Sequence, residues 1–536
     1  MKQLYLLILV LGVTFFKNDV VAQHYYLPLN NDVNARYDSS LYKVGSSFHT
    51  SIKPYFSDEI KLVTPIDSIG AYMMKPTKFQ KTWVGRKLFN EHLLEVRDDD
   101  YFLYGDFIME FDGGRSMETQ GDKNLFINSR GIAVGGTFGK HFSFNSSFLE
   151  SQSTFSSYID SSIRKTFVVP GASRIKNYDN KFDYGTVNGT IAFSLKKHFS
   201  FQLGHDKNFI GDGYRSVLLS DNSYNYPFLK VNANFWKIKY MVLYAIFQDG
   251  PYVTVFDESF RRKYGVFHYL DINIGKRLTF GVLESIIWEN DSARVFDYNY
   301  LNPVIFLRPV EFSIGSPDNA LLGFNLKYKI SSKVYAYGQV MLDEFKLNEI
   351  KADSGWWGNK HAFQVGFRTF NPFGLDRLEL SSEFNYARPF TYQHRTSRSA
   401  YAHYNQPLAH PLGANFWESV TSINYGYKRW QLSTRFNYAK VGYDVDSIGE
   451  LQNFGNNVLL SYETRPSDYG NDMLQGLETT VINVDLKLWY VLNPASNLVV
   501  EAGTRLRQAE NRYGTDETIF FFLGIRSTLS NRYLDF

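Results

Sequence analysis

Apolar and polar side chains alternate with a period of two along many stretches of this chain. In residues 482–490 every second side chain is apolar, and Asn483, Asp485 and Lys487 stand between them. The same alternation recurs in residues 322–329, 430–438 and 519–528. Because successive side chains of a strand point to opposite faces, each stretch has one apolar face and one polar face. Many of the stretches run about ten residues, which suits a tilted membrane-spanning strand.

The alternation predicts eighteen strands. We place them at residues 101–112, 130–139, 141–151, 184–195, 198–205, 227–236, 238–247, 266–275, 277–288, 320–330, 332–342, 361–370, 376–387, 417–427, 430–440, 478–491, 495–507 and 517–529. Tight turns alternate with mostly longer connections; the turns include 139–140, 196–197, 275–276, 331–332 and 493–494. Short turns at one end and long loops at the other are typical of an outer-membrane barrel. To keep the count even, we interpret residues 456–464 as a β-excursion inside a long outer loop.

The predicted fold class is therefore all-β, a transmembrane antiparallel β-barrel of about 18 strands over residues 99–536. A short, partly helical N-terminal segment, residues 23–98, precedes it. Four residues of this segment fall at helical spacing, namely Val33, Tyr37, Leu41 and Val44. Residues 87–96 are compatible with a second short helix. Two interpretations of the segment stay open: a periplasmic extension, or a plug that closes the periplasmic mouth.

Residues 1–22 predict a signal peptide. Lys2 precedes an apolar run at 4–16, and Ala22 ends a cleavage site before Gln23. The run is too short for a membrane-spanning helix. The chain has no cysteine, which excludes disulfides and a lipid anchor on an N-terminal cysteine. We therefore expect export across the inner membrane and localisation in the outer membrane.

Composition agrees with a membrane barrel. Aromatic residues make up 17% of the chain, yet the mean hydropathy is −0.29. An apolar outer wall around a wet lumen has this combination. The net charge of +3 gives no support for nucleic-acid binding. We interpret the final residue, Phe536, as the aromatic end of the last strand, which many outer-membrane barrels present to the insertion machinery.

The loop at residues 388–416 combines cations with aromatic rings and contains no acidic residue. Its candidate ligand-binding residues are Arg388, Tyr392, Arg395, Arg398, Tyr401 and Tyr404, and His394, His403 and His410 lie among them. Aromatic faces stack on sugars, and arginine pairs with carboxylate or sulfate groups. The loop would therefore suit an acidic polysaccharide. The alternative is a solvated loop whose cations meet anionic lipopolysaccharide.

Two further outer loops contribute candidates. Tyr214 and Arg215 follow the Gly-Asp-Gly sequence at 211–213, which predicts a tight turn because the lysine and hydroxyl residue of a phosphate loop are absent. Arg308 lies in residues 289–319, a segment too apolar for open water. We expect this segment to fold into the barrel mouth and narrow it, with direct ligand contact as the alternative.

No motif predicts catalysis. The sequence lacks the G-x-S-x-G and H-E-x-x-H patterns, and no carboxylate pair for glycoside hydrolysis can be picked from the many lumen-facing charges. We therefore predict no enzyme activity, no catalytic residue, no metal site and no cofactor.

Several long blocks resemble the capsule-assembly Wzi family, and within it the RemB-type gliding-motility proteins of the Bacteroidetes. The blocks are residues 198–245, 300–330, 338–350 and 355–367, the last reading GWWGNKHAFQVGF. The resemblance implies an outer-membrane barrel of eighteen strands with a helical N-terminal portion at the periplasmic end. It also implies a non-enzymatic role in holding or organising surface polysaccharide.

The leading hypothesis is a barrel that binds or assembles surface polysaccharide, with gliding motility as one setting for that role. The alternatives are a diffusion porin and an accessory subunit of an outer-membrane secretion or adhesin-moving machine. The expected partners are surface polysaccharide, outer-membrane lipid and lipopolysaccharide. If the protein is a subunit of a larger machine, other outer-membrane or motility proteins are partners as well. No nucleic-acid partner is expected.

Overall fold

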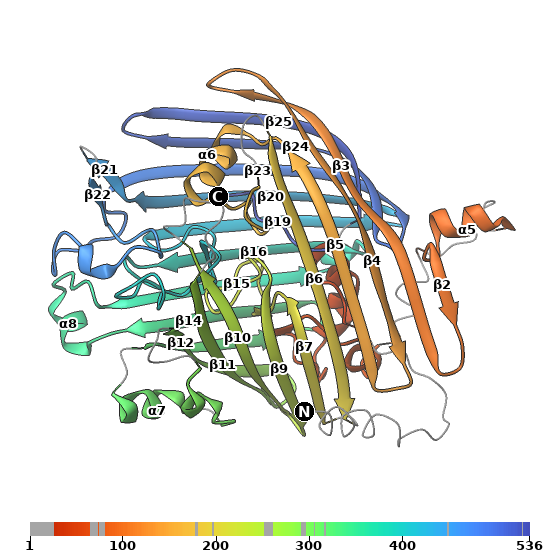
Figure 1. Cartoon of the computed structure of the whole chain (residues 1–536), viewed down its shortest axis with the longest axis horizontal. Coiled ribbons are helices and arrows are strands. Elements are labelled where there is room, and N and C mark those ends of the chain that lie inside the picture. Colours follow the sequence, from red (N-terminus) through yellow and green to blue (C-terminus); the bar gives the residue numbers. More distant parts are fainter. Residues whose placement is uncertain are drawn as a thin grey trace.

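A computed structural model describes residues 26–64, 73, 81–176, 181–195, 198–250, 261–290, 296–304, 306–315, 318–447, 450–527 and 529–536. The predicted signal peptide at 1–22 and the predicted turn at 196–197 lie outside the described residues. The described residues form a closed β-barrel with segments packed inside it (Figure 1).

Eighteen antiparallel strands form the wall. They are β3 (Tyr101–Glu118), β4 (Lys123–Phe138), β5 (Phe142–Ser153), β6 (Phe182–Leu195), β7 (Phe199–Asp206), β9 (Tyr226–Phe235), β10 (Ile238–Asp249), β11 (Arg261–Ile274), β12 (Leu278–Glu289), β13 (Asn319–Lys329), β14 (Val334–Glu344), β15 (Lys360–Phe370), β16 (Leu378–Ala387), β19 (Phe416–Tyr427), β20 (Trp430–Tyr443), β23 (Leu477–Asn493), β24 (Leu498–Asn511) and β25 (Gly514–Ser527). Each pairs with the next, and β25 pairs with β3 to close the ring. The barrel prediction is confirmed, and every predicted strand overlaps one wall strand.

The alternation in the sequence divides each strand between two faces. On β13, Leu322 and Leu326 face outward and are 38% and 46% exposed, whereas Asn325 and Lys327 face the lumen and are fully buried. The connections at one end of the barrel are all short, and we call this the short-turn end. Gly139 and Gly275 have positive φ in two of these turns, a conformation that glycine adopts without strain. The longer connections lie at the opposite, long-loop end.

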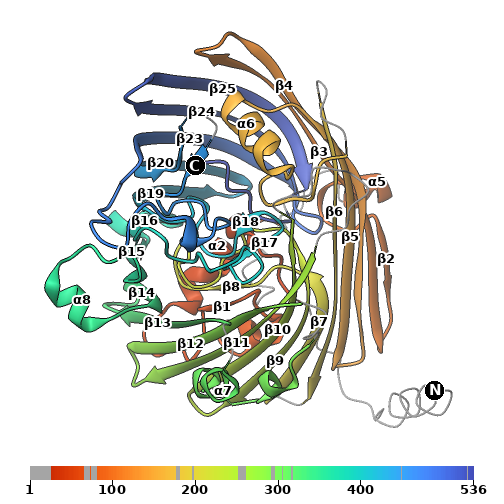
Figure 2. The same ribbon diagram turned by 60° about the vertical axis from the view of Figure 1, so that its left-hand side comes forward.

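The N-terminal segment fills the barrel beside the short-turn end. Helix α2 (Asn31–Leu41), strand β1 (Ile52–Lys53) and helix α3 (Ser57–Lys61) lie inside the ring of strands (Figure 2). The Asn30 side chain caps α2 by accepting a hydrogen bond from the Val33 backbone N–H at 3.1 Å. The predicted helical spacing is correct for Val33, Tyr37 and Leu41, which are buried on α2. It is wrong for Val44, which lies in a turn after the helix ends.

The second predicted helix, at 87–96, is wrong over most of its length. Helix α5 (Trp83–Phe89) covers only the first three residues of this range. Strand β2 (Leu94–Arg97) covers its last three and pairs with β3 outside the ring. The side chains of Leu94 and Val96 are exposed, as the outward side of an added strand requires.

Two long connections enter the barrel from the long-loop end. Residues 207–225 carry β8 (Phe209–Ile210), which pairs with β1, and residues 388–415 carry β17 (Ala402–His403) and β18 (Gln406–Pro407). Their apolar side chains pack with lumen-facing wall residues into one core, which includes Val217, Leu218, Leu219, Tyr392, Tyr401, Leu408, Phe247, Phe267, Leu283 and Phe416. We call residues 26–64, 207–225 and 388–415 together the plug.

The C-terminal tail contradicts the interpretation of Phe536 as the end of the last strand. Strand β25 ends at Ser527, and residues 529–536 turn into the lumen. The Phe536 ring packs edge-on against Tyr158, with ring centroids 5.8 Å apart. The tail follows this path because its polar groups find partners inside: Arg532 pairs with Glu110 at 2.5 Å.

The remaining helices and short strands lie in the connections between wall strands. They are α6 (Ser157–Thr166), η2 (Tyr298–Leu301), α7 (Leu307–Ile314), α8 (Leu347–Ala352), η3 (Pro372–Gly374), β21 (Val445–Ser447), β22 (Glu450–Gln452) and η4 (Tyr462–Thr464). In the part of the chain that the structure describes, no helix is both long and apolar enough to cross a membrane. Residues 456–464 lie in a loop as predicted, but they form turns and η4 rather than a β-excursion.

The expectation that residues 289–319 narrow the mouth is also wrong. Helix α7 lies on the outside of the wall, where Leu307 packs with the outward-facing Val266, Ile286 and Trp288. These wall residues alternate with lumen-facing ones on β11 and β12, so the helix cannot reach the lumen from this position.

Candidate functional site

Two predicted ligand-binding residues lie within the plug: Arg215 is buried there, and Tyr214 is half-buried. The Arg215 side chain is only 1% exposed, and its Nη2 lies 2.9 Å from Glu418 Oε1 and 3.1 Å from Asp535 Oδ1. The Tyr214 hydroxyl donates a hydrogen bond to Asp535 at 3.0 Å. The Arg215 side chain is therefore out of reach of a surface polymer.

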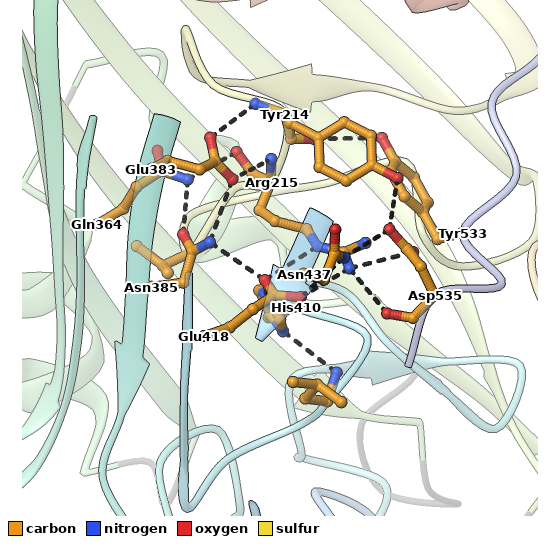
Figure 3. A network of polar contacts seen from close by, with 12 residues as sticks. Tyr214, Arg215, Gln364, Glu383, Asn385, His410, Glu418, Asn437, Tyr533 and Asp535 are labelled. Carbon is orange, nitrogen blue, oxygen red and sulfur yellow. Dashed lines mark hydrogen bonds and ion pairs between the residues drawn. The ribbon is translucent and has the colours of Figure 1, made fainter. Parts of the chain in front are cut away.

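Figure 3 shows the polar cluster to which they belong. Glu383 on β16 accepts hydrogen bonds from the backbone N–H groups of Tyr214 and Arg215 at 2.9 and 3.0 Å. On the other side, His410 Nε2 lies 2.8 Å from Glu418 on β19. The cluster therefore ties residues 207–225, residues 388–415 and the C-terminal tail to the same part of the wall.

The electrostatics of the tail depend on this arrangement. Burial alone would raise the pKa of the Asp535 carboxyl, but the guanidinium groups of Arg215 and Arg435 hold that pKa below its ordinary value. Buried charges of this kind stay ionised only when they are paired and hydrogen-bonded. The cluster is thus an internal clamp for the tail and the plug.

Tyr392 and Tyr401 also connect two segments of the plug. Both side chains are buried, and their rings stack with centroids 5.6 Å apart. Their hydroxyls donate to the backbone carbonyls of Val217 and Leu218 at 2.7 and 2.6 Å. Two tyrosines of the 388–415 connection therefore hold residues 207–225 in place.

The other predicted residues are scattered. Tyr404 is half-buried against Tyr224, with ring centroids 4.9 Å apart. Arg388 donates to the Asn471 carbonyl at 3.0 Å, and Arg398 pairs with Glu289 at 3.0 Å.

Only Arg395 and Arg308 of the predicted set expose most of the side chain. The Arg395 side chain is 63% exposed and lies 3.2 Å from Glu463 at the long-loop end. The Arg308 side chain is 61% exposed, but it lies on α7 outside the wall, beside Glu311 at 3.6 Å. The structure therefore brings no shared ligand site together from the nine predicted residues.

The long-loop end carries an aromatic group that the sequence reasoning did not select. The Trp357 and Tyr462 rings lie with centroids 4.6 Å apart and 35° between their planes, and both are partly exposed. The Arg465 guanidinium lies over the Trp357 ring at 4.2 Å. Trp356 adjoins Trp357, with ring centroids 5.8 Å apart. We call Trp356, Trp357, Tyr462, Arg395 and Arg465 the aromatic patch.

Three loops build the patch. Trp356 and Trp357 come from the β14–β15 connection, Tyr462 and Arg465 from the β20–β23 connection, and Arg395 from the β16–β19 connection. The Trp357 backbone N–H donates to Asp468 at 3.0 Å, which fixes the first loop to the second. The tryptophan pair stands within a block that carries the Wzi resemblance, but its pairing with Tyr462 depends on loop packing that no local pattern reports.

Charge in the patch is nearly balanced. Arg395 pairs with Glu463, and Arg465 pairs with Asp468 at 2.5 Å. His394 adds no charge near neutrality, because burial, followed by the nearby Lys360 and Arg395, lowers its pKa to about 3. The patch therefore offers ring faces and guanidinium donors rather than a strong positive field.

The described residues offer no candidate metal-binding cluster. Among them, no cluster of three or more histidine, aspartate or glutamate side chains has the geometry to hold a metal ion. The histidines of the 388–415 connection are held apart by other partners: His403 Nδ1 accepts from the Gln248 backbone N–H at 3.0 Å, whereas His410 faces Glu418.

No family model matches the chain, and no curated protein matches it. Among solved structures, the chain is similar to Wzi of Escherichia coli, described as an outer membrane protein involved in group 1 capsule assembly and a carbohydrate-binding β-barrel. The TM-score is 0.53 at 14% identity, covering 94% of this chain and 100% of Wzi. This likeness supports the barrel fold.

Two Pseudomonas aeruginosa structures also match over less of the chain. OpdK with vanillate has a TM-score of 0.42 at 7% identity, covering 78% of this chain and 97% of its own. OccK8 (OprE) has a TM-score of 0.40 at 10% identity, covering 79% of this chain and 97% of its own.

Proposed function

We propose that this protein is an outer-membrane β-barrel, closed by its own plug and tail, that binds cell-surface polysaccharide at the aromatic patch. The observation that carries the proposal is the pair of partly exposed rings, Trp357 and Tyr462, with Arg465 beside them. Supporting it are the Wzi-like fold and the carbohydrate binding stated for Wzi itself.

The wall suits a membrane. Its outward side chains form an apolar belt, for example Leu326 at 46%, Phe367 at 47% and Leu488 at 44% exposed. Exposed leucine and phenylalanine in this density are stable when lipid rather than water surrounds them. With the short-turn end in the periplasm, the long-loop end and its aromatic patch face the cell exterior.

The patch suits a sugar polymer. Aromatic faces pack on the C–H faces of sugar rings, and such a contact contributes about 0.5–1.5 kcal/mol beyond its buried area, by analogy with aromatic pairs. Arg465 and Arg395 are held by carboxylates and are therefore positioned to donate to hydroxyl or carboxylate groups of the polymer.

A diffusion porin fits the structure less well. The lumen holds an apolar core made by wall and plug side chains, together with the buried clamp of Arg215, Glu418 and Asp535. Solute passage would require these contacts to separate. A RemB-type relationship and a role in gliding motility stay predictions of the sequence.

The test is binding of the purified, detergent-folded protein to polysaccharide extracted from the source organism. Replacing both Trp357 and Tyr462 by alanine is expected to weaken binding about tenfold, the loss of two stacking contacts at about 0.5–1.5 kcal/mol each. Tyr513→Ala is the matched control, because Tyr513 is 73% exposed in the β24–β25 turn outside the patch. The proposal is wrong if the double variant and the control bind alike.

A further inference from the structure

Three side chains that hydrogen-bond or carry charge face outward on neighbouring wall strands, among mostly apolar outward side chains. They are Tyr240 on β10, His268 on β11 and Glu284 on β12. His268 and Glu284 are directly opposite each other in the strand register, and the Tyr240 hydroxyl lies 2.9 Å from His268 Nδ1. A carboxylate facing lipid without partners is strongly destabilising.

Residues 296–304 and 306–315, which we call the wall segment, cover these groups. Glu284 accepts hydrogen bonds from the backbone N–H groups of Phe306, Leu307 and Arg308 at 2.6, 2.7 and 2.6 Å. These N–H groups open helix α7, whose N-terminus favours a negative charge. Glu284 is thereby satisfied by the segment that hides it.

The inner side of the wall segment packs like a protein core. Leu307 and Tyr300 are fully buried, and the Tyr300 ring lies 4.9 Å from the Trp288 ring between centroids. The Tyr300 hydroxyl donates to Asp318 at 2.6 Å. The segment is therefore fixed to the outside of β10–β12 and is part of the folded barrel.

The opposite side of the segment is apolar and uncovered. Val304, Phe306 and Phe312 are 54%, 66% and 83% exposed. This surface continues into the belt, since Leu322 on β13 is paired with Glu284 in the strand register and is itself exposed. Water would make such a continuous apolar face unfavourable.

We propose that the wall segment is an in-plane lipid-contacting element that replaces the bare wall over β10–β12, with acyl chains of the surrounding membrane as its occupant. The covered part of β12, from Glu284 to Trp288, is the half nearer the long-loop end, so the lipids are those of the leaflet on that side. Arg308 projects from the same helix, where a long cationic side chain reaches lipid phosphates while its stem stays apolar. This inference rests on the proposed membrane location.

The chain has no cysteine, so single-cysteine labelling tests the inference directly. Phe312→Cys and Val304→Cys each receive a nitroxide after the protein is folded into phosphatidylcholine vesicles. Collision with oxygen, which concentrates in lipid, is compared with collision with a water-soluble nickel complex. Leu326→Cys supplies the belt reference and Tyr513→Cys the aqueous reference.

The expected result is that both segment labels shift to the oxygen-rich, nickel-poor behaviour of Leu326→Cys. If they match Tyr513→Cys while Leu326→Cys remains lipid-exposed, the wall segment faces water and the inference is wrong. If the Leu326→Cys label itself behaves as aqueous, the membrane location fails, which is a separate result. Both segment side chains point away from the packed core, so neither substitution disturbs the fold.

Discussion

At the scale of single residues, buried polar side chains join segments of the plug that lie far apart in the sequence: the Tyr392 hydroxyl donates to the Val217 carbonyl, and Arg215 pairs with Asp535. Tyr392 and Tyr401 were candidate polysaccharide-binding residues in the sequence, and both side chains are buried in the plug. Alternation reports facing direction in a strand, whereas a connection such as 388–415 has no fixed period. Tyrosine gives little help, because it is common both in cores and on surfaces. The partner of Arg215, Asp535, lies at the other end of the chain, beyond any local pattern.

The buried position of Arg215 leads to a prediction about stability. Arg215→Ala leaves the carboxylates of Glu418 and Asp535 buried without their guanidinium partner, so the free energy of unfolding should fall by about 3–5 kcal/mol. The measurement is urea unfolding of the protein folded in vesicles.

The matched control for that prediction is Arg395→Ala. Its side chain is 63% exposed and pairs with a carboxylate that is itself mostly exposed, so the free energy of unfolding should change by less than about 1 kcal/mol. Equal unfolding midpoints for the two variants would contradict the assignment of Arg215 as a clamp.

At the scale of elements, the strands were predictable because one face meets an apolar surrounding and the other a packed lumen. A predicted strand ends too early where its two faces no longer differ in polarity. Strand β3 continues to Glu118 through Gly113, Gly114 and Arg115, which are small or polar on both faces and are held by backbone pairing with β25. The wall segment was placed in the mouth because its apolar character indicated burial but not the side of the wall.

The 388–415 connection is expected to loosen in acid. Burial lowers the pKa of His403 to about 3, and its Nδ1 accepts a hydrogen bond, so the folded loop holds this imidazole neutral. When the loop opens, His403 regains a pKa near 6.5 and binds a proton. Stability of the closed loop is therefore full above about pH 6.5 and is lost as pH falls toward 3, by about 2–3 kcal/mol at about pH 4.5.

Hydrogen exchange of residues 400–408, corrected for the intrinsic rate at each pH, measures this opening. Protection should fall between neutral pH and about pH 4.5, and it should fall less in His403→Gln, which keeps a donor and an acceptor without titrating. Unchanged protection in the wild-type protein across this range would refute the prediction.

At the scale of the whole molecule, segments distant in sequence fill one lumen. Residues 26–64 enter beside the short-turn end, two long connections enter from the long-loop end, and the C-terminal tail lies between them (Figure 2). Cavities of about 180 and 810 Å³ remain beside the plug, and both are lined by charged side chains such as Arg435. The arrangement favours a protein that works from its outer surface rather than through its lumen.

Ion conductance in planar lipid bilayers tests that claim most directly. The folded protein should add almost no steady current at any salt concentration, because the apolar core of plug and wall and the clamp of Arg215, Glu418 and Asp535 close the lumen. A variant lacking residues 26–64 serves as the control and should conduct more, since that segment fills one side of the barrel. Stable, open, porin-like current steps from the full-length protein would contradict the account.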